Sequence, residues 1–138
     1  MKEEVPKVIE ECVAKSVAGQ LSFSRFVRRL AVSGVERYHA DYCRQEATFY
    51  FEDGASHLVC VALGNDPIAK EFSASVIQEA VRQSQQNEIT YLDFVRKTKE
   101  AGCVGYLVQI AGKCVIYLGR AGETLVERFP TSTSSTNE

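Results

Sequence analysis

The spacing of hydrophobic residues changes from a helical period to a strand period within the first half of the chain. Apolar positions over residues 5–18 fall on one face of a helix, and a second helix follows between Ser22, a residue suited to capping, and Gly34. Beyond Gly34 aromatic and polar residues alternate, and Asp53-Gly54 is typical of a tight hairpin turn. This pattern predicts three strands, at residues 36–43, 46–52 and 57–63. The last strand is almost entirely apolar and is therefore expected to be central in its sheet.

The second half of the chain repeats this order of elements after a break at residues 64–67. Asp66 is suited to cap a helix that runs from Pro67 to about residue 83, and a further helix is expected between Thr90 and Gly102. Three more strands are predicted, at residues 103–110, 113–118 and 123–128. Each half therefore consists of two helices followed by a three-strand meander.

The two halves also match residue by residue. Residues 21–42 align with residues 89–110 without a gap, and after a one-residue slip in the hairpin Tyr50 aligns with Tyr117. Self-similarity of this kind indicates a duplicated unit. Because each unit has one apolar sheet face that must be covered, two units favour a shared core. The sequence therefore predicts an α+β fold of two tandem, pseudo-symmetric α-α-β-β-β units with antiparallel strands, arranged in either one sheet or two.

Length and composition fit one folded domain of ordinary size. The 138 residues are 45% hydrophobic and 25% charged, which suffices for a sizeable core. We expect a single α+β domain over residues 1–130, with repeat units at about 5–64 and 65–129. The Ser/Thr-rich tail over residues 131–138 is expected to be disordered.

Net charge and cysteine content indicate which classes of partner and which cellular compartment to expect. A net charge of −2 offers no field that would attract nucleic acid or an anionic membrane, and no apolar run is long enough to span a bilayer. The five cysteines have an odd count, wide spacing and no CxxC pair, so neither a disulfide framework nor a structural zinc site is expected. We therefore expect a cytoplasmic protein without a nucleic-acid partner, a membrane partner, a bound metal or another cofactor.

One strand of the first unit carries the candidate functional side chains. The repeat places Tyr38 together with Tyr106 on the buried side of the sheet, and side chains alternate along a strand. Polar residues at the intervening positions then lie on the opposite side, which is solvent, a cleft or an interface. The ligand-binding candidates are His39, Asp41, Cys43, Tyr50 and His57.

Two classes of function are compatible with this face. The first is a non-enzymatic module that binds a partner protein or a small-molecule ligand, at the sheet face or in the cleft between the repeats, with a homodimer as one form. The alternative is a small enzyme or metal-binding protein, since Cys with His can form a nucleophile and base, and His with Asp can ligate metal. The alternative uses His39, Asp41, Cys43, Glu46 and His57. The second unit has Leu107 and Gln109 where the first has His39 and Asp41, so functional chemistry is expected on the first unit.

Two segments of the chain resemble a known family. Residues 34–54, GVERYHADYCRQEATFYFEDG, and residues 102–130, GCVGYLVQIAGKCVIYLGRAGETLVERFP, resemble the YbcV-like family of uncharacterised bacterial and phage-associated proteins. The similar features are a Gly-Val…Tyr-x-x-Asp-Tyr strand and a late Tyr-x-Gly…Gly-Glu hairpin, within a resemblance over roughly residues 5–130. The chain departs from the family pattern in its His-Ala-Asp-Tyr and Val-Gln-Ile strands. The resemblance implies a compact α+β domain and brings no functional residues with it.

Overall fold

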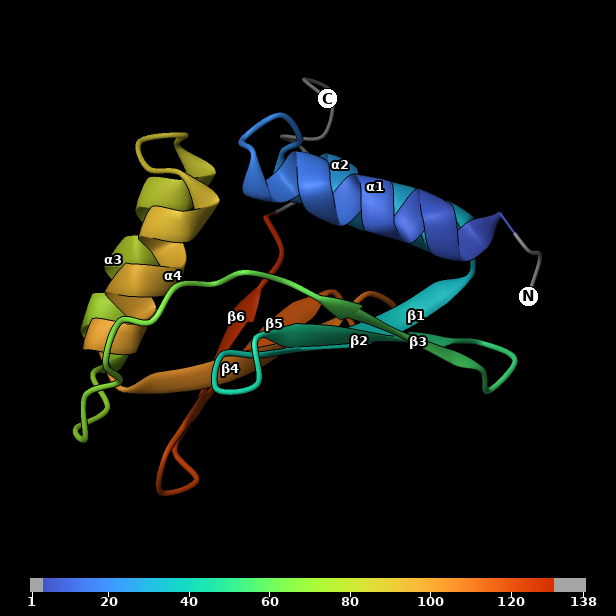
Figure 1. Cartoon of the computed structure of the whole chain (residues 1–138). Helices are drawn as coiled ribbons and strands as arrows, with labels where there is room; N and C mark the ends of the chain where they lie inside the picture. The colour runs from blue at the N-terminus through green and yellow to red at the C-terminus, as the bar shows by residue number, and fades with distance from the viewer. Residues whose placement is uncertain (1–3, 131–138) are drawn as a thin grey trace.

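Four helices lie on one side of a single antiparallel sheet of six strands in the computed structural model, which describes residues 4–130 (Figure 1). The helices are α1 (Val5–Val17), α2 (Phe23–Val32), α3 (Ala74–Gln85) and α4 (Tyr91–Glu100). The strands are β1 (Val35–Asp41), β2 (Glu46–Phe51), β3 (Ser56–Cys60), β4 (Cys103–Gln109), β5 (Cys114–Gly119) and β6 (Thr124–Arg128). The strand order is β3-β2-β1-β4-β5-β6, so β1 and β4 join the two units at the centre of the sheet.

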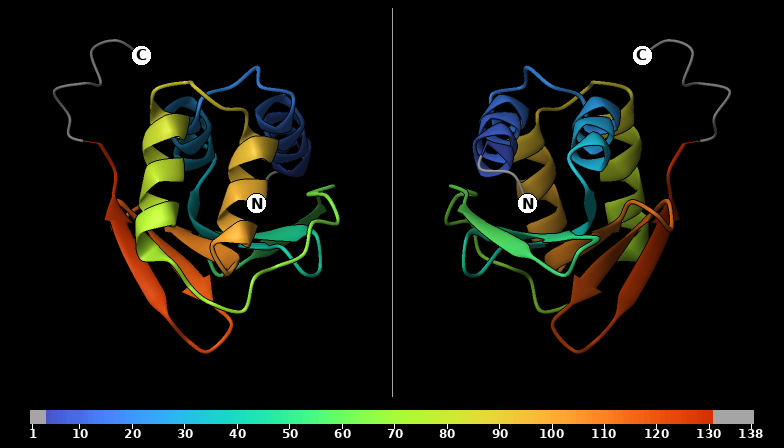
Figure 2. Two further views of the ribbon diagram at one scale, coloured as in Figure 1. Left: turned by 90° about the vertical axis from the view of Figure 1, so that its left-hand side faces the viewer. Right: turned by 90° about the vertical axis from the view of Figure 1, so that its right-hand side faces the viewer.

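This architecture confirms the predicted α+β class and the repeated order of helices and strands. All six strands form one sheet, and all four helices cover the same face of it (Figure 2). Buried side chains from both units form one hydrophobic cluster between the helices and the sheet. None of the helices within residues 4–130 is long and apolar enough to cross a membrane. The predicted disordered tail lies outside the described residues.

The two units repeat with a constant offset. Each strand of the second unit begins 68 residues after its counterpart: β1 and β4 at 35 and 103, β2 and β5 at 46 and 114, β3 and β6 at 56 and 124. Helices α2 and α4 begin at 23 and 91, which is the same offset. In the pairing of the central strands, His39 lies opposite Leu107, its own counterpart. A pseudo-two-fold axis therefore passes through this pair, and it is normal to the sheet because all the helices lie on one side.

The one-residue slip predicted in the second hairpin is wrong. Because β2 and β5 keep the common offset, Tyr117 is the counterpart of Phe49, and both side chains are buried against the helices. Tyr50 corresponds to Leu118 instead, and both of these are only partly buried. Matching two tyrosines suggested the slip, whereas two hairpin turns of the same length require an unchanged offset.

Tyrosine side chains fill much of the space between the helices and the sheet. Tyr38 and Tyr106, which the repeat predicts to face inward, are 4% and 5% exposed. The hydroxyl of Tyr106 shares a hydrogen bond of 2.7 Å with that of Tyr91 on α4, and the Tyr42 hydroxyl shares one of 2.8 Å with Thr98 Oγ1. The predicted orientation is confirmed, and buried hydroxyls obtain the partners that burial requires.

The third strand lies at the edge of the sheet, so its predicted central position is wrong. β3 ends at Cys60 and pairs with β2 alone. The next apolar residues, Val61 and Leu63, are 9% and 3% exposed although they belong to no strand. The backbone N–H of Leu63 donates to Gln45 Oε1 at 2.8 Å. The apolar run therefore reflects a buried connection that follows an edge strand.

The connection between the units, residues 61–73, also differs from the prediction. A helix capped by Asp66 is expected from Pro67 onward, but α3 begins only at Ala74, after the capping hydroxyl of Ser73. This crossover starts at the β3 edge and ends at α3, which lies above the opposite half of the sheet (Figure 2). Because strands are spaced about 4.8 Å apart, the crossover must span the width of several strands. An extended chain covers this distance with fewer residues than a helix, which rises only about 1.5 Å per residue, so the crossover is extended.

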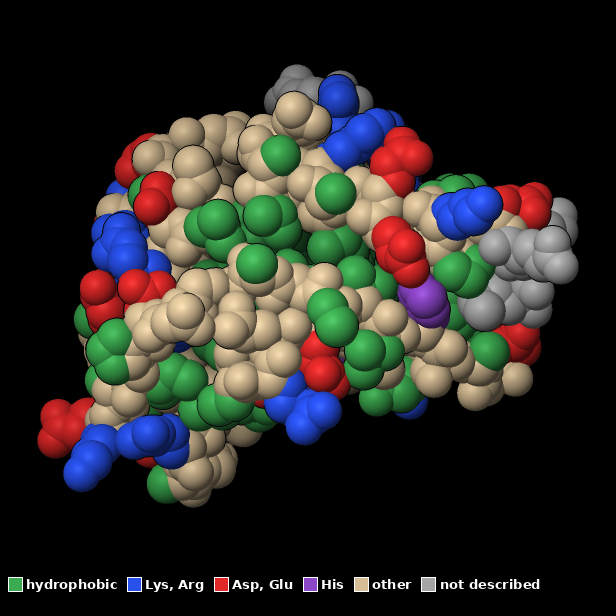
Figure 3. All heavy atoms as spheres, viewed as in Figure 1, with side chains coloured by type: hydrophobic (Ala, Val, Ile, Leu, Met, Phe, Trp, Pro, Cys, Tyr) green, Lys and Arg blue, Asp and Glu red, His purple; other side chains and the backbone are tan. Residues whose placement is uncertain are grey.

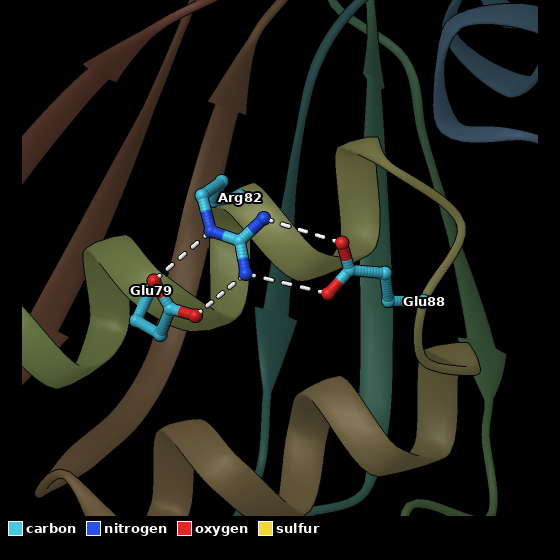
Figure 4. Close-up of polar contacts among 3 residues, drawn as sticks. All are labelled: Glu79, Arg82 and Glu88. Carbon is cyan, nitrogen blue, oxygen red and sulfur yellow. Dashed lines mark hydrogen bonds and ion pairs between the residues drawn. The ribbon is translucent and has the colours of Figure 1, made fainter.

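Arg82 holds the connection between α3 and α4 (Figure 4). Its guanidinium donates to Glu79 one turn earlier in α3, with Nη2 2.7 Å from Oε2, and to Glu88 in the following loop, with Nη1 3.2 Å from Oε2. These hydrogen bonds raise the pKa of Arg82 above its ordinary value. All three side chains are about half-exposed, so the cluster orients the loop and adds little stability.

Candidate functional site

The side of the sheet opposite the helices, called the outer face here, is covered by no helix or strand among residues 4–130 (Figures 1 and 2). Cross-strand pairing arranges its side chains in rows that run across all the strands. The central row contains Leu58, Thr48, His39, Leu107, Ile116 and Val126. The basic row contains Ser56, Tyr50, Arg37, Gln109, Cys114 and Arg128. The acidic row contains Cys60, Glu46, Asp41, Gly105, Leu118 and Thr124.

Three of the predicted ligand-binding residues lie on the outer face, one in each row. His39 stands in the middle of the central row, Asp41 in the acidic row and Tyr50 in the basic row, and all three are half-buried. Glu46, which belongs to the enzyme alternative, lies directly opposite Asp41 on β2. Alternation along β1 and β2 thus places these four side chains on one surface; a binding role for them stays a prediction.

The carboxylates of the acidic row are held by the turn between β1 and β2. Asp41 Oδ1 accepts the backbone N–H groups of Cys43 at 3.0 Å and of Arg44 at 3.2 Å. Glu46 Oε2 lies 3.2 Å from Arg44 Nε, and the Glu46 side chain is only 16% exposed. Both carboxylates are therefore fixed in position near one end of the face.

The basic row contains a stacked pair. The guanidinium carbon of Arg37 lies 4.1 Å from the centre of the Tyr50 ring, which is a cation–π distance. Arg37 Nε also lies 3.1 Å from Glu36 Oε2, and both side chains are roughly two-fifths exposed. The positive charge of Arg37 therefore stacks on Tyr50 at the outer face and stays partly exposed.

The other two predicted residues lie elsewhere. Cys43 is exposed in the turn that follows β1. His57 lies opposite Phe49 in the β2–β3 pairing and so faces the helices, where its Nε2 is 2.9 Å from Glu10 Oε2 of α1. The structure does not bring His57 together with His39, because the two histidines are on opposite sides of the sheet.

A groove lies between α1 and the edge strand β3, with a volume of about 560 Å³. Apolar residues such as Val13, Val17 and Val59 line most of it, and Figure 3 shows hydrophobic side chains gathered below α1. None of the predicted ligand-binding residues lines this groove.

The outer face combines aromatic, apolar and charged side chains. Among residues 4–130, no group of three or more His, Cys, Asp and Glu side chains is placed to hold a metal ion. Within the described part of the chain, Cys43 is a free, exposed cysteine and forms no hydrogen bond with His39. Aromatic, apolar and charged groups on a broad, open surface suit contact with another surface.

Sequence reasoning missed several residues of this face. Arg37, Leu107 and Ile116 were not among the predicted site residues, although strand alternation places each of them away from the buried tyrosines. The signal that could have found them is the repeat itself. Once each residue is matched to the one 68 positions later, Leu107 is the counterpart of His39, and alternation places both on the side opposite the buried tyrosines; the pairing of β1 with β4, and so the rows, came from the structure.

The match to a known protein family covers the second of the two units. Residues 64–128 match the family described as protein of unknown function (DUF1398). The DUF1398 match spans most of the crossover, both helices and all three strands of the second unit, which confirms the expectation of a domain of unknown function. The predicted ligand-binding residues all precede the DUF1398 match. No curated protein matches the chain.

Proposed function

We propose that this protein is a non-enzymatic binding module whose outer face binds the same face of a second copy, forming a homodimer. The observation that carries the proposal is the separation of charge between the two flanking rows. Arg37 and Arg128 lie in the basic row, whereas Asp41 and Glu46 lie in the acidic row on the other side of the central row. Such a face is complementary to itself.

Duplication by itself does not create this pattern. The pseudo-two-fold axis exchanges the basic row with the acidic row, so a perfect repeat would place the same residues in both. The first unit instead has Arg37 where the second has Gly105, and Asp41 where the second has Gln109. Divergence between the units has therefore made the two rows opposite in charge.

Only one two-fold arrangement of two outer faces satisfies these charges. An axis in the interface, parallel to the central row, places the basic row of each copy over the acidic row of the other. Arg37 of one copy then faces Asp41 of the second copy, and this contact occurs twice. An axis parallel to the strands would place each row over itself and oppose like charges. Packed sheets are rotated by about 30°, which keeps the rows in approximate register near the axis.

The central row supplies the apolar part of the contact. Leu107 and Ile116 are half-buried, while Leu58 and Val126 are 48% and 50% exposed. In the proposed arrangement each of these side chains meets the central row of the second copy. Removal of apolar surface from water stabilises such a contact by about 25 cal/mol per Å².

The remaining predictions belong to the same proposal. The resemblance to the YbcV-like family supports a small α+β module of that kind, and the hydrophobic cluster that spans both units supports the predicted single domain over residues 1–130. All five cysteines are free thiols, which supports a reducing cytoplasm as the compartment.

Leu107→Asp is expected to convert the dimer into a monomer. Leu107 lies beside the proposed axis, so the substitution brings two carboxylates close together in the middle of the interface. Burial of unpaired charge costs several kcal/mol, which corresponds to a dissociation constant at least about 100-fold higher. Sedimentation velocity on the full chain, from micromolar to hundreds of micromolar, measures this change.

Val32→Asp is the matched control for Leu107→Asp. Val32 is 85% exposed on α2, in the helical layer, so the same carboxylate there should leave the dimer intact. Thermal unfolding followed by circular dichroism establishes that both variants are folded. A natural-sequence chain that remains monomeric throughout, or a folded Leu107→Asp variant that still dimerises, would contradict the proposal.

Charge exchange tests the direction of the axis. Arg37→Glu and Asp41→Lys are each expected to weaken the homodimer about tenfold, because each substitution opposes like charges at both copies of the contact. A mixture of the two variants should form a heterodimer close to the original affinity, since both contacts then join opposite charges. A mixture that associates no better than the separate variants would exclude this arrangement.

A further inference from the structure

A polar hollow of about 240 Å³ lies where the β1–β2 turn, the crossover and the β5–β6 turn meet. It is at the junction of the two units: Gln45 comes from the first unit, Asn65 from the crossover, and Lys99 and Arg120 from the second unit. It is separate from the outer face, and the dimer proposed above does not depend on it.

Lys99 is the unusual residue of this hollow. It belongs to α4 and is only 2% exposed, although it carries a charge. Its Nζ donates hydrogen bonds of 3.0 Å to the carbonyl oxygens of Leu63 and Gly64, and it lies 5.9 Å from the centre of the Tyr42 ring. An ammonium group has three N–H donors, and these contacts leave one of them available.

The charge of Lys99 has no ionic partner among the residues that the structure describes. No carboxylate within residues 4–130 forms an ion pair with its ammonium group, although Asp66 also lines the hollow. Buried charges in proteins are normally paired, because removing them from water is costly. Arg120 adds a second positive charge at the rim, so the hollow carries two cations against one carboxylate.

The fold of the unit does not require a lysine at this position. The counterpart of Lys99 in the first unit is Ala31, which is exposed on α2. Lys99 is therefore specific to the second unit, where it both ties down the crossover and points a charge toward the hollow.

We propose that this hollow is a binding site for a small anion, a phosphate or a carboxylate group, held by the free N–H of Lys99 and by Arg120. Such an anion offsets the buried charge of Lys99 and receives charge-assisted hydrogen bonds, which are stronger than neutral ones. A ligand of the class of a phosphorylated or carboxylated metabolite can supply this group.

Titration of the full chain with inorganic phosphate, and separately with acetate, tests the site. Backbone amide NMR shifts are expected to move at Gly64 and Asn65 with saturable, millimolar binding of one or both anions at constant ionic strength. The titration in which the shifts saturate shows whether the site binds a phosphate or a carboxylate group. Arg120→Ala is expected to weaken binding about tenfold, because it removes one charge-assisted contact from an exposed turn. Lys99→Met is expected to abolish it.

Arg44→Ala is the matched control, because Arg44 is an exposed arginine of the neighbouring β1–β2 turn and does not line the hollow. Its binding should equal that of the natural sequence. Absence of saturable shifts with both anions overturns the proposal, as does an equal loss of binding in Arg44→Ala and Arg120→Ala. If Lys99→Met unfolds the chain, the comparison of Arg120→Ala with Arg44→Ala decides the outcome.

Discussion

Raising the pH above about 10, where tyrosine ordinarily ionises, is expected to unfold this protein cooperatively. Five of its six tyrosines lie between the helices and the sheet or pack against that core. They are Tyr38, Tyr42, Tyr91, Tyr106 and Tyr117. Burial is the main cause that raises the pKa of each hydroxyl, to about 12 for Tyr91 and well above the ordinary value for Tyr38 and Tyr106. Tyr91 keeps part of its ring exposed, but its hydroxyl is enclosed by its hydrogen bond with Tyr106.

The sign of the effect follows from proton counting. Above pH 10 the unfolded chain has released its tyrosine protons while the folded chain retains them, so stability is full below about 10 and falls as the pH rises toward the higher folded values. Each such tyrosine lowers the free energy of unfolding by about 1.4 kcal/mol for every pH unit between its unfolded and folded pKa. Five of them together lower it by about 7 kcal/mol over one pH unit, which is comparable with the total stability of a domain.

Parallel pH titrations of near-ultraviolet tyrosinate absorbance and far-ultraviolet circular dichroism measure this transition. Most of the tyrosinate signal should appear together with the loss of helical signal. Tyr38→Phe removes one titrating group, so the free energy of unfolding should fall less steeply with pH, by roughly 1.4 kcal/mol per pH unit. Tyrosinate that forms gradually while the helical signal persists would show that the interior tyrosines are accessible to solvent.

Gly102→Ala is expected to be far more destabilising than Gly34→Ala, although the two glycines occupy equivalent positions. Both end a helix with positive φ, +84° at Gly102 and +92° at Gly34, where alanine is disfavoured by about 1–2 kcal/mol. A Cβ at Gly102 would also overlap the backbone carbonyl oxygen of Glu71, whereas at Gly34 the nearest atom is Phe51 Cδ1 at 4.0 Å. We expect a total loss of at least about 3 kcal/mol at Gly102.

Urea unfolding of both variants, followed by circular dichroism, gives the two free energies. Gly34→Ala serves as the internal control, because it includes the strain of the positive φ without the overlap with the crossover. Equal losses at the two positions would mean that the crossover moves away from α4 at no cost, in conflict with the hydrogen bonds that tie Ala69 and Ser73 to the end of α4.

The candidate site shows how far sequence reasoning reached. Alternation was sufficient to place His39 and Asp41 on the face opposite the buried tyrosines, because neighbouring residues of one strand must point to opposite sides. The same reasoning could not place His57. The hairpin register sets Phe49 opposite His57, and that pairing turns the histidine toward α1.

Periodicity and self-alignment alone established the two-unit organisation, the helix-helix-meander order and the inward tyrosines, since all of these depend on residues that are near one another in the chain. The edge position of β3, the long crossover and the burial of Lys99 came only from the assembled molecule. They depend on contacts between distant segments, such as the hydrogen bond from Lys99 to Leu63, 36 residues earlier, and no local pattern specifies which segments meet.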